Sequence, residues 1–401
     1  MNVERILLDE TLSTYTRHLQ PQQTSSNSNP WHAQSLAHGA VGTALFAIER
    51  THRGEAAHAE AHAWLTHATK APISAVDSTG LFLGAPALAF VLDTTGHYTE
   101  ARARLHECVL TLTRRRLRIA HARLAAGELA AFHEYDLLYG LTGLGAYLLR
   151  TAPTSSTMEQ LLHYLIALAR PLPYNAHLPG WWVGHDPETR PDPHGGHANF
   201  GLAHGFTGPL LLLSKALLRG LIVDGHHDAL TDMCGWLTRW KQPGDRGPWW
   251  PETLTRAELA TGAPDQPGPA RPSWCYGTPG IARAGQLAAL ALRDTTLQDG
   301  FEHAALACLT DPNQLARLTD PGLCHGWAGL YQTTRHTVRD ARIRELATHL
   351  PVLAAALTHQ AQDLPASSGF LTGATGVALA LTTAAAPETP TCGWDACLLT
   401  D

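Results

Sequence analysis

Charged residues are scarce in this chain of 401 residues, and lysine is nearly absent. Asp, Glu, Lys and Arg together make up 16% of the sequence, and the formal net charge at pH 7 is −6. Lysine occurs only as Lys70, Lys215 and Lys241, and arginine supplies the rest of the positive charge. A protein that neutralises many phosphates needs a basic surplus. We therefore expect no nucleic acid as a partner.

Long uninterrupted apolar runs are also missing. The most apolar segment, residues 209–223, is interrupted by Lys215 and Arg219, so no segment is typical of a membrane span. The opening MNVERILLDETL has charges inside its first apolar stretch and no signal-peptide core. The seven cysteines, an odd number without regular spacing, do not form the disulfide framework of a secreted protein. These absences predict a cytoplasmic chain with reduced thiols.

What the sequence has instead is a recurring glycine motif. Each copy consists of a glycine, two residues, a small residue and an apolar run with the character of a helix. The first glycines of the copies are Gly39, Gly84, Gly140, Gly205, Gly277, Gly326 and Gly373. Their separations range from 45 residues (39 to 84) to 72 residues (205 to 277), longer than the common solenoid repeats.

The motif predicts a tight turn that leads into a helix. Glycine allows a backbone conformation or a close approach that other residues resist, and strand-like alternation is almost absent between the motifs. Each repeat is then a helical hairpin with a variable loop. We predict an all-α fold in which seven hairpins close into an α/α toroid with inner and outer helix layers. An open solenoid is the alternative. Residues 1–401 are expected to form one domain.

Two intervals between motifs are unusually long. Residues 170–201 and 241–273 are rich in proline, glycine and tryptophan, and neither can form a single helix. Loops of this length in a compact domain are often functional. Both precede a motif that carries reactive side chains, so we predict loop insertions that wall the mouth of an active site. Simple surface insertions are the alternative.

Soft-metal ligands occupy equivalent positions in two consecutive repeats. Cys275 and Cys324 each lie two residues before their glycine, and His325 follows Cys324 directly. Because consecutive hairpins are neighbours, the three side chains can converge. Two thiols and an imidazole suit zinc, and three protein ligands leave a fourth position open. The sequence therefore predicts one Zn²⁺ that acts on a thiol substrate.

Four further residues are candidates for the chemistry. His204, directly before its glycine, is the candidate general acid or base. Asp136 orients a histidine or takes protons, and a cap at the start of a helix is the alternative. Arg271 either stabilises an oxyanion or forms a loop salt bridge. Tyr276 is a proton donor or a wall of the site. His38 stands at the register of His204, but a structural role is favoured for it.

These residues resemble the lanthionine synthetase C-like family, and specifically its stand-alone lanthipeptide cyclases. The resemblance rests on GLAHGFTGP, SWCYGTPG and LCHGWAG, which begin at residues 201, 273 and 323, with support from DLLYGLTG and the closing GWDACLL. It implies an α/α toroid of seven inner and seven outer helices. It also implies that the zinc ligands are Cys275, Cys324 and His325. The residues that it implies as lining the site are His204, Asp136, Arg271 and Tyr276.

The resemblance further implies an activity in lantibiotic biosynthesis. A zinc-dependent cyclase of this kind catalyses an intramolecular Michael-type addition in a dehydrated precursor peptide, which consists of leader and core. Cysteine thiolates add to dehydroalanine or dehydrobutyrine and form lanthionine or methyllanthionine thioether rings. A dehydratase and an ABC exporter are implied as partners, with peripheral membrane association through their complex. Family members carry a β-rich extension, for which residues 170–201 are too short.

Other activities remain open on the sequence alone. A related protein could add glutathione to dehydroamino acids, and a zinc-stabilised scaffold could bind peptides without catalysis. A protein prenyltransferase would also combine a helical toroid with zinc, but the lysine-poor rim argues against a diphosphate pocket. A glycoside hydrolase would need a pair of carboxylates at the rim, which the register does not provide.

Overall fold

The computed structural model describes residues 3–21, 31–386 and 391–401, and helices dominate it. The helices that follow the glycine motifs are α2 (Ala40–His52), α4 (Ala85–Thr95), α7 (Leu141–Thr151), α9 (Thr207–Leu218), α12 (Thr278–Leu292), α15 (Trp327–Asp340) and α17 (Ala374–Ala385). The other long helices are α1 (Val3–His18), α3 (His58–Ala68), α5 (Thr99–Ala126), α8 (Ser156–Ala169), α10 (His226–Arg239), α13 (Thr295–Leu309) and α16 (Leu350–Gln360). Within the described ranges, no helix combines the length and apolarity needed to cross a membrane.

The glycines stand where the chain turns sharply into a helix, as predicted. A Cβ atom on Gly140 would lie 2.2 Å from the amide nitrogen of Asp136, and one on Gly326 would lie 2.3 Å from the carbonyl oxygen of Asp320. Real Cβ atoms do not approach backbone atoms so closely. The motif glycine is therefore required because the preceding turn folds back onto it.

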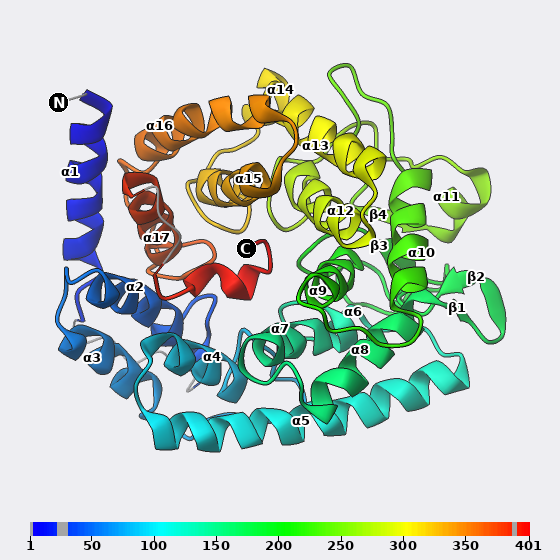
Figure 1. Ribbon diagram of the computed structural model, residues 1–401, viewed down its shortest axis with the longest axis horizontal. Coiled ribbons are helices and arrows are strands. Elements are labelled where there is room, and N and C mark those ends of the chain that lie inside the picture. Colours follow the sequence, from blue (N-terminus) through cyan, green and yellow to red (C-terminus); the bar gives the residue numbers. More distant parts are fainter. Residues whose placement is uncertain (1–2, 22–30, 387–390) are drawn as a thin grey trace.

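The helices that follow the motifs form a closed inner ring. Around the ring, α2 contacts α4, and the contacts continue through α7, α9, α12, α15 and α17, which returns to α2 (Figure 1). This closure confirms the predicted toroid and excludes the open solenoid. Short segments complete the helix set: α6 (Phe132–Tyr135), α11 (Arg256–Thr261), α14 (Pro312–Leu315) and the 3₁₀ turns η1 (His32–Gln34), η2 (Arg344–His349) and η3 (Trp394–Leu398).

The remaining long helices cover the ring from outside. Most inner helices pack against the helix that follows them in the chain: α2 on α3, α4 on α5, α7 on α8, α9 on α10, α12 on α13 and α15 on α16. The last inner helix differs, because α17 packs against α1 from the opposite end of the sequence. The final pair therefore joins segments that are far apart in the chain.

Main-chain hydrogen bonds link the motifs around the rim. Written as amide donor to carbonyl acceptor, they are Leu36 to Phe82 (2.9 Å), Phe82 to Leu138 (3.3 Å), Leu137 to Ala203 (3.1 Å), Ala203 to Cys275 (3.2 Å), Cys275 to Cys324 (3.3 Å), Cys324 to Leu371 (2.8 Å) and Leu371 to Ala37 (3.1 Å). All of them point the same way around the ring and return to the first motif. The residues just before the glycines thus occupy equivalent places, which is the register that the sequence predicts.

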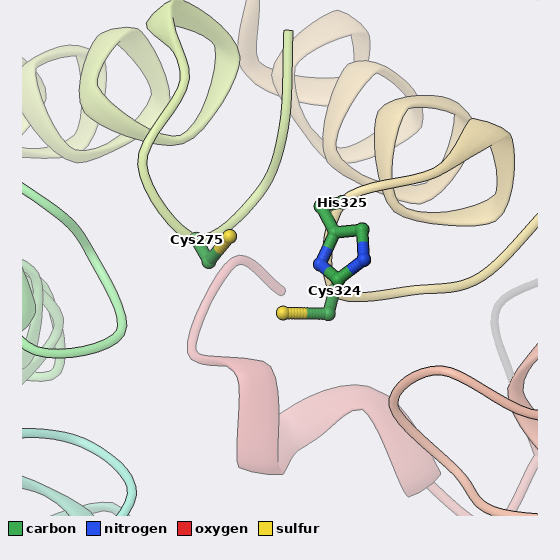
Figure 2. A group of neighbouring side chains, drawn as sticks. All are labelled: Cys275, Cys324 and His325. Atoms are coloured by element: carbon green, nitrogen blue, oxygen red, sulfur yellow. The ribbon is translucent and has the colours of Figure 1, made fainter. Parts of the chain in front are cut away.

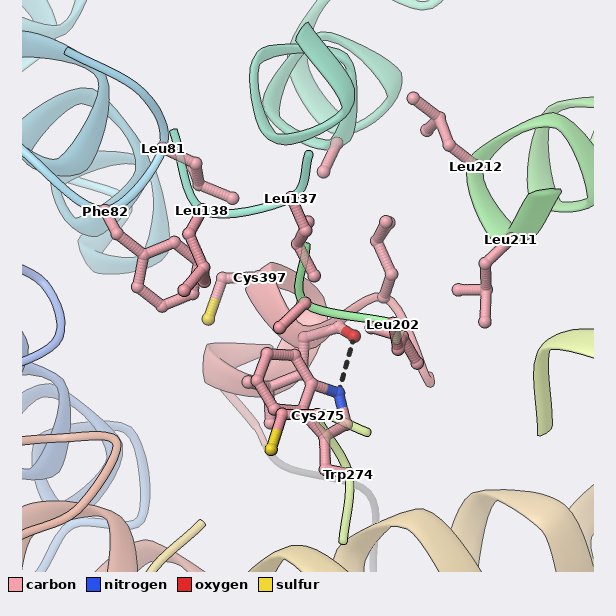
Figure 3. Close-up of a cluster of buried hydrophobic side chains, with 14 of the residues drawn as sticks. Leu81, Phe82, Leu137, Leu138, Leu202, Leu211, Leu212, Trp274, Cys275 and Cys397 are labelled. Carbon is pink, nitrogen blue, oxygen red and sulfur yellow. Dashed lines mark hydrogen bonds between the residues drawn. The ribbon is translucent and has the colours of Figure 1, made fainter. Parts of the chain in front are cut away.

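The C-terminal segment, residues 391–401, lies in the middle of the ring (Figure 1). Inner-helix side chains and the Cys275 loop hold it. The Trp274 indole N–H donates to the carbonyl of Leu398 over 3.2 Å, within a cluster of buried apolar side chains (Figure 3). The His336 imidazole lies 2.7 Å from a carboxylate oxygen of Asp395. The loop that carries Cys275 therefore rests on this segment.

The two long intervals contain most of the β structure and pair with each other. Residues 170–201 contain β1 (Pro171–Leu172), β2 (Asn175–Pro179) and β3 (His197–Asn199), and residues 241–273 contain β4 (Thr253–Thr255) and α11. β1 pairs with β2, and β3 pairs antiparallel with β4, with Asn199 opposite Thr253. The pairing of β3 with β4 brings the two insertions together beside the motifs that they precede.

Candidate metal centre

Three predicted metal ligands converge at the rim. The loop before α12 supplies Cys275, and the loop before α15 supplies Cys324 and His325 (Figure 2). Their ligand atoms all lie within 4.8 Å of one another. No other group of three His, Cys, Asp or Glu residues in the described ranges meets that criterion. The register of the repeats thus places side by side two cysteines that are 49 positions apart (275 to 324).

The two thiols are free and unequal. Neither forms a disulfide, Cys275 is buried, and Cys324 is partly exposed. The Cys324 thiol, followed by His325 and Ser273, lowers the pKa of Cys275 by hydrogen bonding and charge, against the opposing effect of burial. One sulfur is therefore readily ionised beside a second thiol and an imidazole. This is the soft donor set that zinc takes in proteins, and the residues fit such an ion.

His204 and Asp136 form a tight pair at the same rim. Nδ1 of His204 lies 2.6 Å from Oδ2 of Asp136, whose carboxylate is fully buried. The other carboxylate oxygen accepts from the Tyr139 amide over 2.7 Å. The imidazole also lies against two rings, with centroid distances of 4.8 Å to Phe132 and 5.8 Å to Tyr139. Asp136 thus holds both the histidine and the turn before α7, but it does not cap that helix, whose N-cap residue is Gly140 without a side-chain hydrogen bond.

Tyr276 directly follows the predicted metal ligand Cys275 in the sequence, and its side chain lies near His204. Its ring centroid is 6.3 Å from that of His204. The Asn199 side-chain amide donates to the phenol oxygen over 3.1 Å. Burial raises the pKa of Tyr276 to about 12. The phenol is therefore protonated at neutral pH, and its own hydrogen is left to be donated elsewhere.

Arg271 reaches a carboxylate that links it to the metal ligands. Nη1 of Arg271 lies 3.8 Å from Oδ2 of Asp320, and the same oxygen lies 3.6 Å from Nε2 of His325. The loop salt bridge that was one of two predictions for Arg271 is therefore present. The guanidinium remains partly exposed, so it is also accessible to a ligand.

Three polar residues of this site were not predicted from the sequence. Asn199 and Asp320 each stand six residues before a motif glycine, a shared register position that could have pointed to both of them. Glu252 lies in the second insertion. Desolvation and then the negative charge of Cys275 raise the pKa of Glu252, while Arg271 lowers it. His38, the rim histidine of the first repeat, lies beside Gly369.

A closed ring of helices with a cysteine–histidine cluster at one rim defines a class of α/α-toroid proteins with a candidate soft-metal centre. The chain belongs to the lanthionine synthetase C-like family, because the model of that family, "Lanthionine synthetase C-like protein", matches residues 30–399. The family resemblance expected from the motifs is thus confirmed.

Solved structures agree with the fold. Nisin cyclase superposes with a TM-score of 0.78 at 18% sequence identity, over 98% of this chain and 96% of that chain. A second structure, whose title names the saccharide dGlcA-Glc-Rha-Glc, has a TM-score of 0.47 at 13% identity, over 86% and 95% of the two chains, which is too weak to support an argument. No curated protein sequence matches this chain.

Proposed function

We propose that this protein is a zinc-dependent lanthipeptide cyclase. It adds cysteine thiolates to dehydroalanine or dehydrobutyrine within a precursor peptide and so forms lanthionine or methyllanthionine rings. The observation that carries the proposal is the convergence of Cys275, Cys324 and His325 at a rim that also holds the His204–Asp136 pair. Membership of the lanthionine synthetase C-like family supports the same activity.

Cys275, Cys324 and His325 would hold the zinc ion. When bound by two thiolates and an imidazole, zinc supplies an open position at which a peptide thiol ionises at neutral pH and stays nucleophilic. Cys324 and His325 are partly exposed, so a peptide thiol can reach these two ligands from the rim.

The addition itself needs a proton donor. The thiolate forms a C–S bond at the β-carbon, and the electron pair of the C=C bond moves to the carbonyl oxygen to give an enolate. The α-carbon then takes a proton. His204 is suited to give that proton, because Asp136 holds Nδ1 and leaves Nε2 free. A buried carboxylate also stabilises the protonated imidazole.

Arg271 and Tyr276 are suited to the enolate oxygen. A partly exposed guanidinium can stabilise the developing negative charge. The phenol of Tyr276 can donate its hydrogen, since Asn199 occupies the oxygen as a donor.

The proposal extends to the surroundings of the enzyme. We regard the fold as a ring of seven hairpins, with α1 and α17 as the closing pair, and the contacts between helices support this description. The substrate is a dehydrated precursor peptide with leader and core. A dehydratase and an ABC exporter are the proposed partners of a cytoplasmic enzyme that reaches the membrane through their complex.

The decisive experiment is cyclisation of a dehydrated, cysteine-containing peptide. We expect loss of free thiol without change of mass, and we expect a zinc chelator to abolish it. A parallel reaction with free glutathione and a cysteine-free dehydrated peptide tests addition between molecules. Thiol loss only with glutathione would indicate the glutathione-adding activity, and no reaction with either thiol would indicate a scaffold.

A further inference from the structure

The Asp320 carboxylate lies between two residues of the candidate site. Its Oδ2 atom is 3.6 Å from Nε2 of His325 and 3.8 Å from Nη1 of Arg271. The side chains of Asp320, His325 and Arg271 are each about one-third exposed, so none of them is a fully buried charge. One carboxylate oxygen therefore faces both a candidate metal ligand and a candidate oxyanion-binding group.

The turn around Asp320 holds the carboxylate in place. Its second oxygen, Oδ1, accepts from the amide of Gly322 over 2.9 Å. The carbonyl of Asp320 accepts from the amide of Trp327 over 3.1 Å, at the start of α15. Any side chain on Gly326 would collide with these oxygens, at 2.3 and 2.5 Å for a Cβ atom. With Oδ1 bound to the turn, Oδ2 is the oxygen left to face His325.

The same turn occurs at Asn199, in an earlier repeat. Asn199 also stands six residues before its motif glycine, Gly205. Its Oδ1 accepts from Gly201 over 2.9 Å, and its carbonyl accepts from Phe206 over 3.0 Å. The remaining atom, Nδ2, then reaches the phenol of Tyr276 over 3.1 Å. At this register one side-chain atom builds the turn and the other contacts a site residue.

We propose that Asp320 is the positioning residue of the candidate metal centre, where it orients the His325 imidazole and ties Arg271 to the same loop. This inference rests on the zinc site of the proposed function. A carboxylate facing Nε2 favours the tautomer with its hydrogen on Nε2, because an N–H dipole is attracted to the negative charge and a lone pair is repelled. Nδ1 then carries the lone pair that a metal needs.

Metal affinity, rather than activity, tests this role. Metal-free protein is titrated with Zn²⁺ in competition with a chromophoric chelator, for the wild type and for Asp320→Asn. We expect Asp320→Asn to bind zinc about 10- to 100-fold more weakly, the usual effect of removing a partner of a metal-ligating histidine. Asparagine keeps the turn, as Asn199 shows, so the substitution removes the charge and leaves the loop intact.

A matched control and a spectroscopic readout separate positioning from folding. Ser367 occupies the same register position before Gly373, in the next repeat, and its atoms lie beside that glycine, so Ser367→Ala should bind zinc as the wild type does. With Co²⁺ in place of zinc, Asp320→Asn should keep the thiolate-to-cobalt absorption, because both sulfurs remain. Thermal unfolding of the metal-free variant should match that of the wild type.

Three results would overturn the inference. Zinc affinity of Asp320→Asn within twofold of the wild type would show that the carboxylate does not act on His325. An equal loss in Ser367→Ala would show that the turn, and not the charge, matters. If zinc binding depends on Asp320 but no dehydrated peptide is cyclised, the positioning role stands and the proposed function fails. Absence of zinc binding by the wild type overturns both.

Discussion

The amide of Cys275 donates a hydrogen bond to the carbonyl of Cys324 over 3.3 Å, so the two candidate metal ligands are joined through their backbones. Every motif around the rim makes the corresponding bond to its neighbour. The thiols are therefore adjacent because consecutive repeats are adjacent, and the ligand set needs no local rearrangement of the fold.

Removal of either rim cysteine should abolish tight metal binding. Cys275→Ala or Cys324→Ala leaves two soft ligands, too few for a stable zinc site of this type. We expect wild-type protein to carry about one zinc per chain and both variants to carry almost none, measured by elemental analysis after dialysis. Cys108→Ala, a partly exposed cysteine outside the group, is the control and should keep its zinc. Full zinc content in Cys275→Ala would place the metal elsewhere.

Loss of the histidine–aspartate pair should slow cyclisation without loss of metal. His204→Ala removes the proposed acid and should lower the rate about 100- to 10,000-fold. Asp136→Asn should also lower it, because the amide no longer fixes the hydrogen on Nδ1. The matched control is His38→Ala, at the same register of the first repeat, which should cyclise normally. If His204→Ala kept the full rate, this histidine would be a bystander.

Tyr276 should act as a protonated phenol at every usable pH. Because burial raises the pKa of Tyr276 to about 12, the phenol does not ionise between pH 6 and 10. We therefore expect Tyr276→Phe to lower the cyclisation rate by the same factor across that range. Asn199→Ala, which frees the phenol, should give a smaller loss. A fall of the factor towards high pH would show that Tyr276 loses its proton within that range.

The motif glycines should be irreplaceable, unlike glycines within outer helices. Gly326→Ala places a Cβ atom 2.3 Å from the carbonyl oxygen of Asp320, so the turn must open. We expect a loss of several kcal/mol in stability, as for other strained or overpacked substitutions, and a weaker metal site. Gly235→Ala in α10 meets no atom within 4 Å and should stabilise the helix by up to about 1 kcal/mol. Urea unfolding of both variants checks this contrast, and equal stabilities would contradict it.

Stability should fall in mild acid because of the histidine beneath the C-terminal segment. Burial lowers the pKa of His336 below its ordinary value of 6.5, despite Asp395 beside it. The unfolded chain therefore takes up the proton at a higher pH than the folded chain. The stabilisation is complete above about pH 6.5 and is lost as the pH falls below it, by at most about 1.4 kcal/mol per pH unit.

His336→Gln should weaken this dependence. The glutamine side chain keeps a polar group near Asp395 but does not itself titrate in this pH range. The free energy of unfolding, measured in urea at pH 7.5 and 5.5, should then change less than in the wild type. His197 and His226 also have pKa values lowered by burial, so part of the dependence should remain. An unchanged slope in His336→Gln would assign the effect to groups other than His336.

Much of the ring could be predicted from its glycines. The motif gives the start of each inner helix, and the register brings Cys275, Cys324 and His325 together. The position six residues before the glycine identifies Asn199 and Asp320 as equivalent residues. It does not predict which side chains they contact. Whether Asp320 faces Arg271 or solvent depends on side-chain rotamers across two repeats. The packing of α1 on α17 and the pairing of β3 with β4 depend on contacts between distant segments, which local patterns do not encode.

The closed ring of rim hydrogen bonds also determines where the protein can open. An open array of repeats has end units with a single neighbour, and local unfolding begins there. In this ring each rim segment is bonded on both sides, so none can detach without breaking two links. The rim amides should therefore exchange with deuterium mainly through global unfolding, and an ion held between two adjacent repeats would slow exchange around the whole circumference.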